Sequence, residues 1–184
     1  MVNIIHPFIH EYDFPYHNYL KEYKTEIINN YFSIKKKYPN VTDYPISLNH
    51  PLSILLEPKL NTLIKENYYI NEPLSKFGFR TYIQNNQNFT SVYHNHLSPS
   101  SISATFYLDP PKDGGEIKFL VGFDEKENQS QEIFIKPKRD KVYVFPYWLF
   151  HSPTPQKDEE YRICFNWGYS SPQRPVHKMT LLPW

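Results

Sequence analysis

The chain has 184 residues, a length that favours one domain with one hydrophobic core over a repeat array or a multi-domain enzyme. Its 20 lysines and arginines nearly balance 19 aspartates and glutamates, so a net charge of +1 provides no global field for nucleic acid or an anionic membrane. We therefore expect neither a nucleic-acid partner nor membrane association. The single cysteine, Cys164, excludes an internal disulfide, and no apolar run reaches 18 residues. These features favour a cytoplasmic protein, in the host cytoplasm if the source is viral.

Residue usage argues against an all-helical fold. The chain contains 5 glycines but 17 prolines, 16 tyrosines and 13 phenylalanines, and its one alanine is Ala104. Tyrosine and phenylalanine favour strands, whereas alanine is the best helix former. The many Lys, Asn and Ile residues suggest an AT-rich coding sequence, as in a virus or a small-genome bacterium.

The first third of the chain has helical periodicity. Apolar residues recur every three or four positions in 16–37, which Pro39 ends, and again in 52–69, which Pro58 interrupts. The sequence therefore predicts a helical N-terminal part over about 1–75.

From about residue 77 onward, short runs of β-branched and aromatic residues alternate with turn residues, as in a chain of antiparallel strands. We expect a mainly β jelly roll, or double-stranded β-helix, over 77–169, buttressed by the N-terminal helices within a single domain of 1–184, with a C-terminal tail at 170–184. A long mobile loop is expected at 124–131. The predicted strands are 79–84, 89–94, 102–108, 116–121, 132–136, 141–145 and 161–167.

Two histidines at the end of one predicted strand could bind a metal. His94 and His96 flank one residue, so on a strand both imidazoles leave the same face, about 6 to 7 Å apart. A jelly roll could bring His151, which follows a later strand, beside them. Three neutral imidazoles leave coordination positions open, as a catalytic metal site requires. Read alone, the His-x-His pair is also compatible with two exposed histidines.

Arg162 begins a strand and, by the period-two alternation, faces the same way as Cys164 and Asn166. A buried arginine in an apolar strand needs an anion, because an unpaired buried charge is very costly. We interpret Cys164 as a small core residue, since no base can be assigned to it as a nucleophile.

The order and spacing of several pieces resemble the Fe(II)- and 2-oxoglutarate-dependent oxygenases, in particular their prolyl-4-hydroxylase-like branch and a bacterial and phage group within the superfamily. The resemblance covers about residues 79 to 169. The pieces that carry it are Tyr93-His-Asn-His96, Ile102 to Leu108, Gly114-Gly-Glu-Ile-Lys-Phe119, Ile135-Lys-Pro137, Val144-Phe-Pro146, His151 and Tyr161-Arg162.

The resemblance implies a role for each matched residue. His94 and His151 match iron ligands, and His96 stands where most of the superfamily has Asp or Glu. Arg162 matches the residue that pairs with the remote carboxylate of 2-oxoglutarate, a task that suits a guanidinium. Tyr107 matches a tyrosine that contributes a hydroxyl to the same carboxylate, although an ordinary core tyrosine is an equal alternative. Asn166 would share this inward face.

The family activity would be a hydroxylation that releases succinate and CO2, with Fe(II), 2-oxoglutarate and ascorbate as a supporting reductant. The substrate would be a small molecule or a peptide, with peptidyl proline as one candidate, and the oligomeric state is open.

Two other classes of function stay open, and the first of them follows from the replacement of a carboxylate by His96. Three imidazoles leave an Fe(II) centre at +2 rather than +1, and they also suit a zinc hydrolase or a dioxygenase that needs no keto acid. The jelly roll could also be a non-catalytic binding or structural module. Arg162 favours 2-oxoglutarate, because neither rival metalloenzyme needs a deep cation there.

Overall fold

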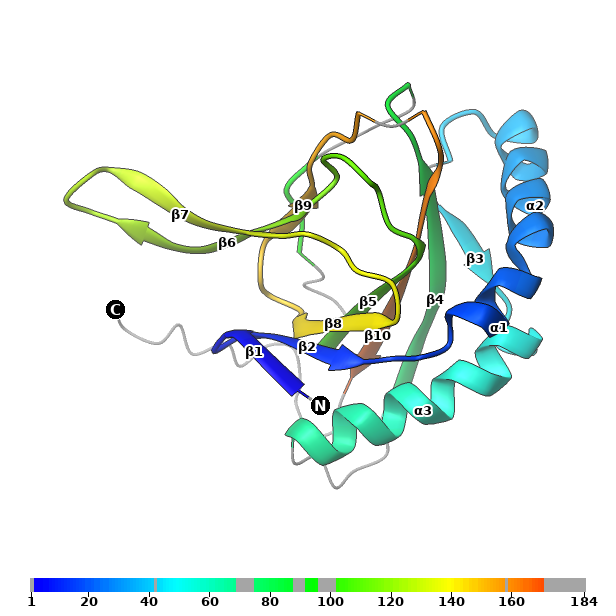
Figure 1. Ribbon diagram of the computed structural model, residues 1–184, viewed down its shortest axis with the longest axis horizontal. Coiled ribbons are helices and arrows are strands. Elements are labelled where there is room, and N and C mark those ends of the chain that lie inside the picture. Colours follow the sequence, from blue (N-terminus) through cyan, green and yellow to red (C-terminus); the bar gives the residue numbers. More distant parts are fainter. Residues whose placement is uncertain are drawn as a thin grey trace.

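The computed structural model describes residues 2–41, 43–68, 75–87, 92–95, 102–157 and 159–170. Within these residues the chain forms three helices and two antiparallel sheets (Figure 1). The larger sheet has the order β1-β2-β8-β5-β10-β4-β3, and the smaller has the order β7-β6-β9. The strands are β1 (Val2–His6), β2 (Ile9–Asp13), β3 (Tyr44–Ile46), β4 (Ser75–Gln84), β5 (Ile102–Asp109), β6 (Ile117–Asp124), β7 (Gln129–Ile135), β8 (Lys141–Pro146), β9 (His151–Pro153) and β10 (Arg162–Ser170).

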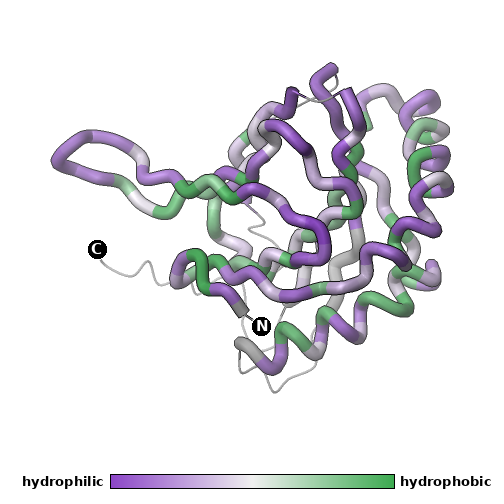
Figure 2. Tube along the Cα trace, in the orientation of Figure 1, coloured by the Kyte–Doolittle hydropathy of each residue, from purple (hydrophilic) through white to green (hydrophobic). Residues whose placement is uncertain are grey.

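The helices α1 (His17–Glu22), α2 (Lys24–Lys37) and α3 (Pro51–Tyr68) lie on the outer face of the seven-stranded sheet (Figure 1). Each turns an apolar stripe inward, and the alternating colours along the helices in Figure 2 follow this division. The stripes pack on buried sheet residues in one cluster, which includes Leu20, Ile27, Tyr31, Leu52, Leu56, Leu60, Ile64, Phe106, Val142 and Phe165. No helix in the described part of the chain is both long and apolar enough to cross a membrane.

Pro58 lies inside α3 without ending it, contrary to the predicted interruption. A proline removes the hydrogen bond to the carbonyl four residues earlier, here that of Ile54. Ile54 is exposed, so the missing hydrogen bond lies on the solvent-facing side of the helix.

The alternation of side chains along β10 positions the functional residues. Ile163, Phe165 and Trp167 are buried with the helices, whereas Cys164 belongs to a second core between the two sheets. The smaller sheet covers this inner face with Ile117 and other apolar residues. A cavity between the sheets can therefore collect the polar side chains of alternate positions.

The structure confirms the mainly β jelly-roll fold with N-terminal helices. It adds strands that the sequence did not predict, namely β1, β2, β3 and the three-residue β9. The prediction of a long loop at 124–131 is wrong. A short hairpin turn lies there instead, since β6 ends at Asp124 and β7 begins at Gln129, and Asn128 closes the turn with a φ of 52°. Residues 89–91 of the predicted strand 89–94 and nearly all of the tail lie outside the described residues.

Candidate functional site

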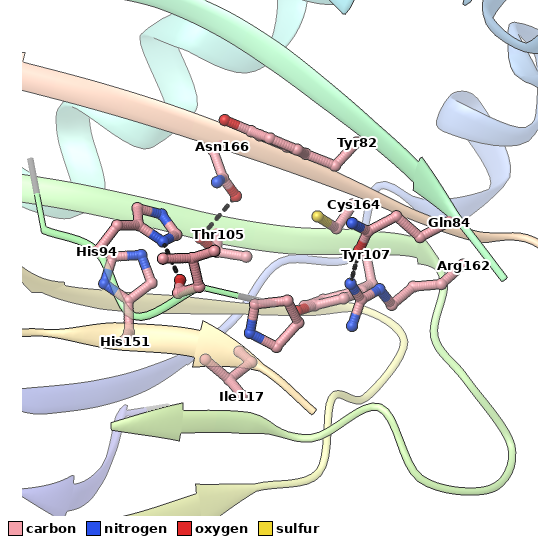
Figure 3. Close-up of a pocket in the computed structure, with 12 residues that line it drawn as sticks. Tyr82, Gln84, His94, Thr105, Tyr107, Ile117, His151, Arg162, Cys164 and Asn166 are labelled. Carbon is pink, nitrogen blue, oxygen red and sulfur yellow. Dashed lines mark hydrogen bonds between the residues drawn. The ribbon is translucent and has the colours of Figure 1, made fainter. Parts of the chain in front are cut away.

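A cavity of about 290 Å³ lies between the two sheets. Figure 3 shows two imidazoles at one end and a guanidinium with a glutamine at the other. Its walls come from β4, β5, β6, β9, β10 and the segment 92–95. The residues that line it are Tyr82, Gln84, Val92, His94, Thr105, Tyr107, Ile117, His151, Pro153, Arg162, Cys164 and Asn166.

Two histidines from distant parts of the chain meet at one end of the cavity. His94 and His151 form an isolated antiparallel bridge, with backbone N–H···O=C bonds of 3.1 and 3.0 Å in the two directions. Their ring centroids are 4.4 Å apart. The backbone pairing therefore fixes both side chains at the same place, as two ligands of one metal ion require.

Both imidazoles are oriented in the same way by the chain before them. Nδ1 of His94 lies 3.0 Å from the carbonyl oxygen of Val92, and Nδ1 of His151 lies 2.9 Å from that of Leu149. Since a carbonyl can only accept, each Nδ1 carries the proton and donates it. The lone pair then resides on Nε2, which is the arrangement typical of metal-binding histidines.

The two histidines differ in their surroundings. His151 is buried between the rings of Phe119 and Phe145, at centroid distances of 5.9 and 4.7 Å. His94 is exposed. His96, the predicted third ligand, lies outside the described residues, and the described residues contain no cluster of three metal-binding side chains.

Arg162 occupies the opposite end of the cavity and is 2% exposed. Its Nη2 donates a hydrogen bond to Oε1 of Gln84, whereas Nε and Nη1 have no hydrogen-bond partner within the described part of the chain. A buried guanidinium with unsatisfied N–H groups is costly unless an anion binds it. The arginine end therefore fits the carboxylate of a ligand.

Two further groups beside Arg162 stay protonated at neutral pH. Tyr107 and Cys164 are paired in the β5–β10 register and are both buried. Burial raises the pKa of Tyr107 far above its ordinary value, so its hydroxyl can donate but not ionise. Burial also raises the pKa of the Cys164 thiol to about 11, which argues against a nucleophile.

Asn166 lines the wall of the cavity between its two ends. Its Oδ1 accepts a hydrogen bond of 2.9 Å from the hydroxyl of Thr105, its neighbour in the β5–β10 register. Tyr82 lies nearby on β4, and burial raises its pKa to about 12. These groups give this wall hydrogen-bonding capacity without charge.

Of the six predicted site residues, His94, His151, Arg162, Tyr107 and Asn166 line the same cavity. Three other lining residues, Gln84, Tyr82 and Thr105, were not predicted from the sequence. The alternation along 79–84 was the available signal, since it places Tyr82 and Gln84 on one face of a strand.

A cluster on the outer face of the smaller sheet braces the His94 segment. The hydroxyl of Tyr93 donates a hydrogen bond to Glu132 on β7. Nζ of Lys118 on β6 lies 4.3 Å from the centroid of the Tyr93 ring and 3.6 Å from a carboxylate oxygen of Glu132. This cluster ties the chain beside His94 to both strands of the hairpin.

Comparison with protein families agrees with this geometry. Residues 81–167 match the family described as "Putative 2OG-Fe(II) oxygenase". This match covers somewhat less than half of the chain. The predicted resemblance to Fe(II)- and 2-oxoglutarate-dependent oxygenases is thereby confirmed, and every described residue that lines the cavity lies within the matched region.

Solved structures share the fold at low sequence identity. The viral collagen prolyl hydroxylase of Paramecium bursaria Chlorella virus-1 aligns with a TM-score of 0.63 at 14% identity, over 89% of this chain and 91% of that one. A Pseudomonas putida prolyl-4-hydroxylase aligns with a TM-score of 0.64 at 12% identity, over 88% and 92%. AviO1 from Streptomyces viridochromogenes aligns with a TM-score of 0.66 at 11% identity, over 91% of both chains. No curated protein matches the sequence. At these identities the likeness establishes the fold alone.

Proposed function

We propose that this chain is an Fe(II)- and 2-oxoglutarate-dependent dioxygenase, with His94, His96 and His151 as the iron ligands. The observation that carries the proposal is the buried Arg162, whose Nε and Nη1 have no partner in the described chain. It faces the same cavity as the two described imidazoles. A cation at one end and metal-binding nitrogens at the other suit a ligand with a chelating keto acid and a remote carboxylate.

The described residues fit both parts of this ligand. The donor set at the metal end is nitrogen with the lone pair on Nε2, which suits Fe(II). At the other end, Arg162 would bind the remote carboxylate and the protonated Tyr107 would donate a second hydrogen bond to it. Asn166 and Thr105 would line the path between the two ends.

Bound Fe(II) would supply O2 activation, coupling the conversion of 2-oxoglutarate and O2 to succinate and CO2 with insertion of the second oxygen atom into a substrate C–H bond. The chain's own contribution is to orient the keto acid and to exclude water. His151 lies against Phe119 and Phe145, which keep that side of the metal end apolar. Val92, which is 74% exposed, also lines the cavity.

The substrate of the proposed reaction would be a small molecule or a peptide. Peptidyl proline is the first candidate to test, because two of the structures that share the fold are named as prolyl hydroxylases. A panel of proline-rich peptides, incubated with the enzyme, Fe(II), 2-oxoglutarate and ascorbate, would show a mass gain of one oxygen atom.

Binding of the keto acid tests the proposal without a known substrate. Calorimetry of the Mn(II)-loaded protein with N-oxalylglycine, an unreactive analogue of 2-oxoglutarate, should show saturable binding. Arg162→Ala should weaken it by about 100-fold, since a hydrogen-bonded charge pair contributes roughly 1.5–3 kcal/mol. Arg139→Ala, at an exposed arginine, is the matched control and should bind like the wild type.

Turnover separates the proposal from its rivals. With Fe(II) and 2-oxoglutarate the wild type should form succinate slowly even without substrate. Binding that is equal in the wild type and Arg162→Ala, together with no succinate, would overturn the proposal. Zinc at one ion per chain in anaerobically prepared protein would then favour a zinc hydrolase.

A further inference from the structure

The partner of Arg162 is a neutral amide rather than a carboxylate. Gln84 lies directly opposite Arg162 in the β4–β10 register, and both side chains are buried. Oε1 of Gln84 accepts one N–H of the guanidinium and carries no charge to offset it. Arg162 forms no ion pair within the described part of the chain, so its full positive charge persists at this end of the cavity.

Two described acidic residues that share a cavity with Arg162 are each paired with a lysine. Arg162 also lines a second cavity, of about 280 Å³, together with Asp109 and Glu160. A carboxylate oxygen of Asp109 lies 2.6 Å from Nζ of Lys24, and one of Glu160 lies 3.1 Å from Nζ of Lys112. These ion pairs leave the charge of Arg162 to be matched by a ligand.

We propose that Gln84 is a positioning residue that makes the site selective for keto acids with a remote carboxylate. It orients the guanidinium through Nη2 while leaving its charge uncompensated. This inference rests on the proposed function, because it assumes that Arg162 binds the remote end of a 2-oxo acid. It adds that selectivity depends on the neutrality of position 84.

Gln84→Glu tests the effect of charge at position 84 while the shape of the side chain stays nearly constant. It would place an internal carboxylate on Arg162, which would satisfy the guanidinium and compete with the carboxylate of the ligand. Gln84→Leu removes the hydrogen bond without adding charge, so it separates orientation from neutrality. Gln129→Glu makes the same substitution as the first variant at an exposed position and serves as the control.

The ligand pair for the test is 2-oxoglutarate and 2-oxopentanoate, which share a five-carbon chain and differ in the remote carboxylate. Calorimetry with each Mn(II)-loaded protein gives the ratio of the two affinities, and thermal unfolding gives the stability of each ligand-free protein. Neither readout depends on turnover.

The wild type should bind 2-oxoglutarate at least tenfold more tightly than 2-oxopentanoate, and Gln129→Glu should match it. Gln84→Glu should bring the ratio close to one and raise the melting temperature of the ligand-free protein. Gln84→Leu should bind both acids more weakly but keep a clear preference for 2-oxoglutarate.

An unchanged ratio in Gln84→Glu would overturn this inference while leaving the proposed function intact. Loss of the preference in Gln84→Leu would also overturn it, and that variant decides the matter if Gln84→Glu does not fold. A wild type that binds neither acid would overturn the proposed function itself.

Discussion

The two ends of the cavity are built differently. At the arginine end, Arg162, Gln84 and Tyr107 are 2%, 6% and 4% exposed and belong to three adjacent strands in the seven-stranded sheet. At the imidazole end, His94 is exposed and is joined to His151 by a single bridge. The arginine end is thus fixed by the core of the fold, whereas the imidazole end is assembled from a short segment and a three-residue strand.

This difference suggests a division of labour within the proposed enzyme. A preformed cation in a packed sheet costs no reorganisation when a carboxylate binds to it. The exposed side chain of His94 places the imidazole end near the surface, where the proposed reaction would need its substrate. Variants that affect one end and spare the other would sharpen this comparison.

The largest contrast is expected between alanine substitutions of the two histidines. Both His151→Ala and His94→Ala should lower Mn(II) affinity by roughly 100-fold or more, because each removes a proposed ligand. His151→Ala should also destabilise the metal-free protein by about 1–3 kcal/mol, since it empties a buried site against Phe119 and Phe145. His94→Ala should change that stability by less than about 0.5 kcal/mol.

Urea unfolding in the presence of a chelator measures the stability, and calorimetry with Mn(II) measures the metal affinity. Equal destabilisation by the two variants would contradict the view that only His151 belongs to the core. Undiminished metal affinity in either variant would remove that histidine from the proposed ligand set.

An alkaline titration probes the arginine end. Burial raises the pKa of Cys164 from its ordinary value of 9.0 to about 11, so the folded state holds the thiol proton more tightly than the unfolded state. The resulting stabilisation is complete below pH 9 and is lost as the pH rises towards 11. Compared with Cys164→Ala, the wild type should therefore lose about 1 kcal/mol of additional stability between pH 8 and 10.

The measurement is urea unfolding of both proteins across this pH range, so that ionisation of the buried tyrosines, which both share, cancels in the difference. A parallel pH dependence of the two proteins would show that the thiol is solvated and that this end is not packed as described. Below pH 9 the thiol should also react slowly with alkylating agents, because it is both protonated and buried.

The sequence predicted the fold well where periodicity is strong. The buried faces of α2 and α3 and the alternation along β10 follow from apolar spacing alone. The strands β1 and β3 were not predicted because they are short edge strands, and β9 was not predicted because it has only three residues. The hairpin turn after Asp124 was mistaken for a loop because β7 begins with four exposed polar residues, which hide the strand pattern.

For the site, the sequence identified residues whose chemistry is distinctive, such as the histidines and Arg162. It could not identify Gln84, because a glutamine in a strand has no distinctive chemistry until the register places it opposite an arginine. The bracing role of Tyr93 could not be predicted for a similar reason, since its partners Lys118 and Glu132 come from strands far along the chain.

The smallest expected effect tests the outer bracing of the imidazole end. Tyr93→Phe removes the hydrogen bond to Glu132 but keeps the ring near Lys118. Because the pair is partly exposed, the free energy of unfolding should fall by only about 0.5 kcal/mol. We expect a loss of Mn(II) affinity of about threefold, since Tyr93 precedes the proposed ligand His94.

Tyr38→Phe, at a tyrosine that is 54% exposed, is the matched control and should change neither quantity. Glu132→Gln should reproduce part of the Tyr93→Phe effect, because an amide oxygen still accepts the hydroxyl but no longer attracts Lys118. If Tyr93→Phe leaves the Mn(II) affinity and the amide-exchange protection of residues 92–95 unchanged, the bridge to His151 alone positions His94. The imidazole end would then be held from the cavity side only, and the contrast with the arginine end would be greater than the outer cluster suggests.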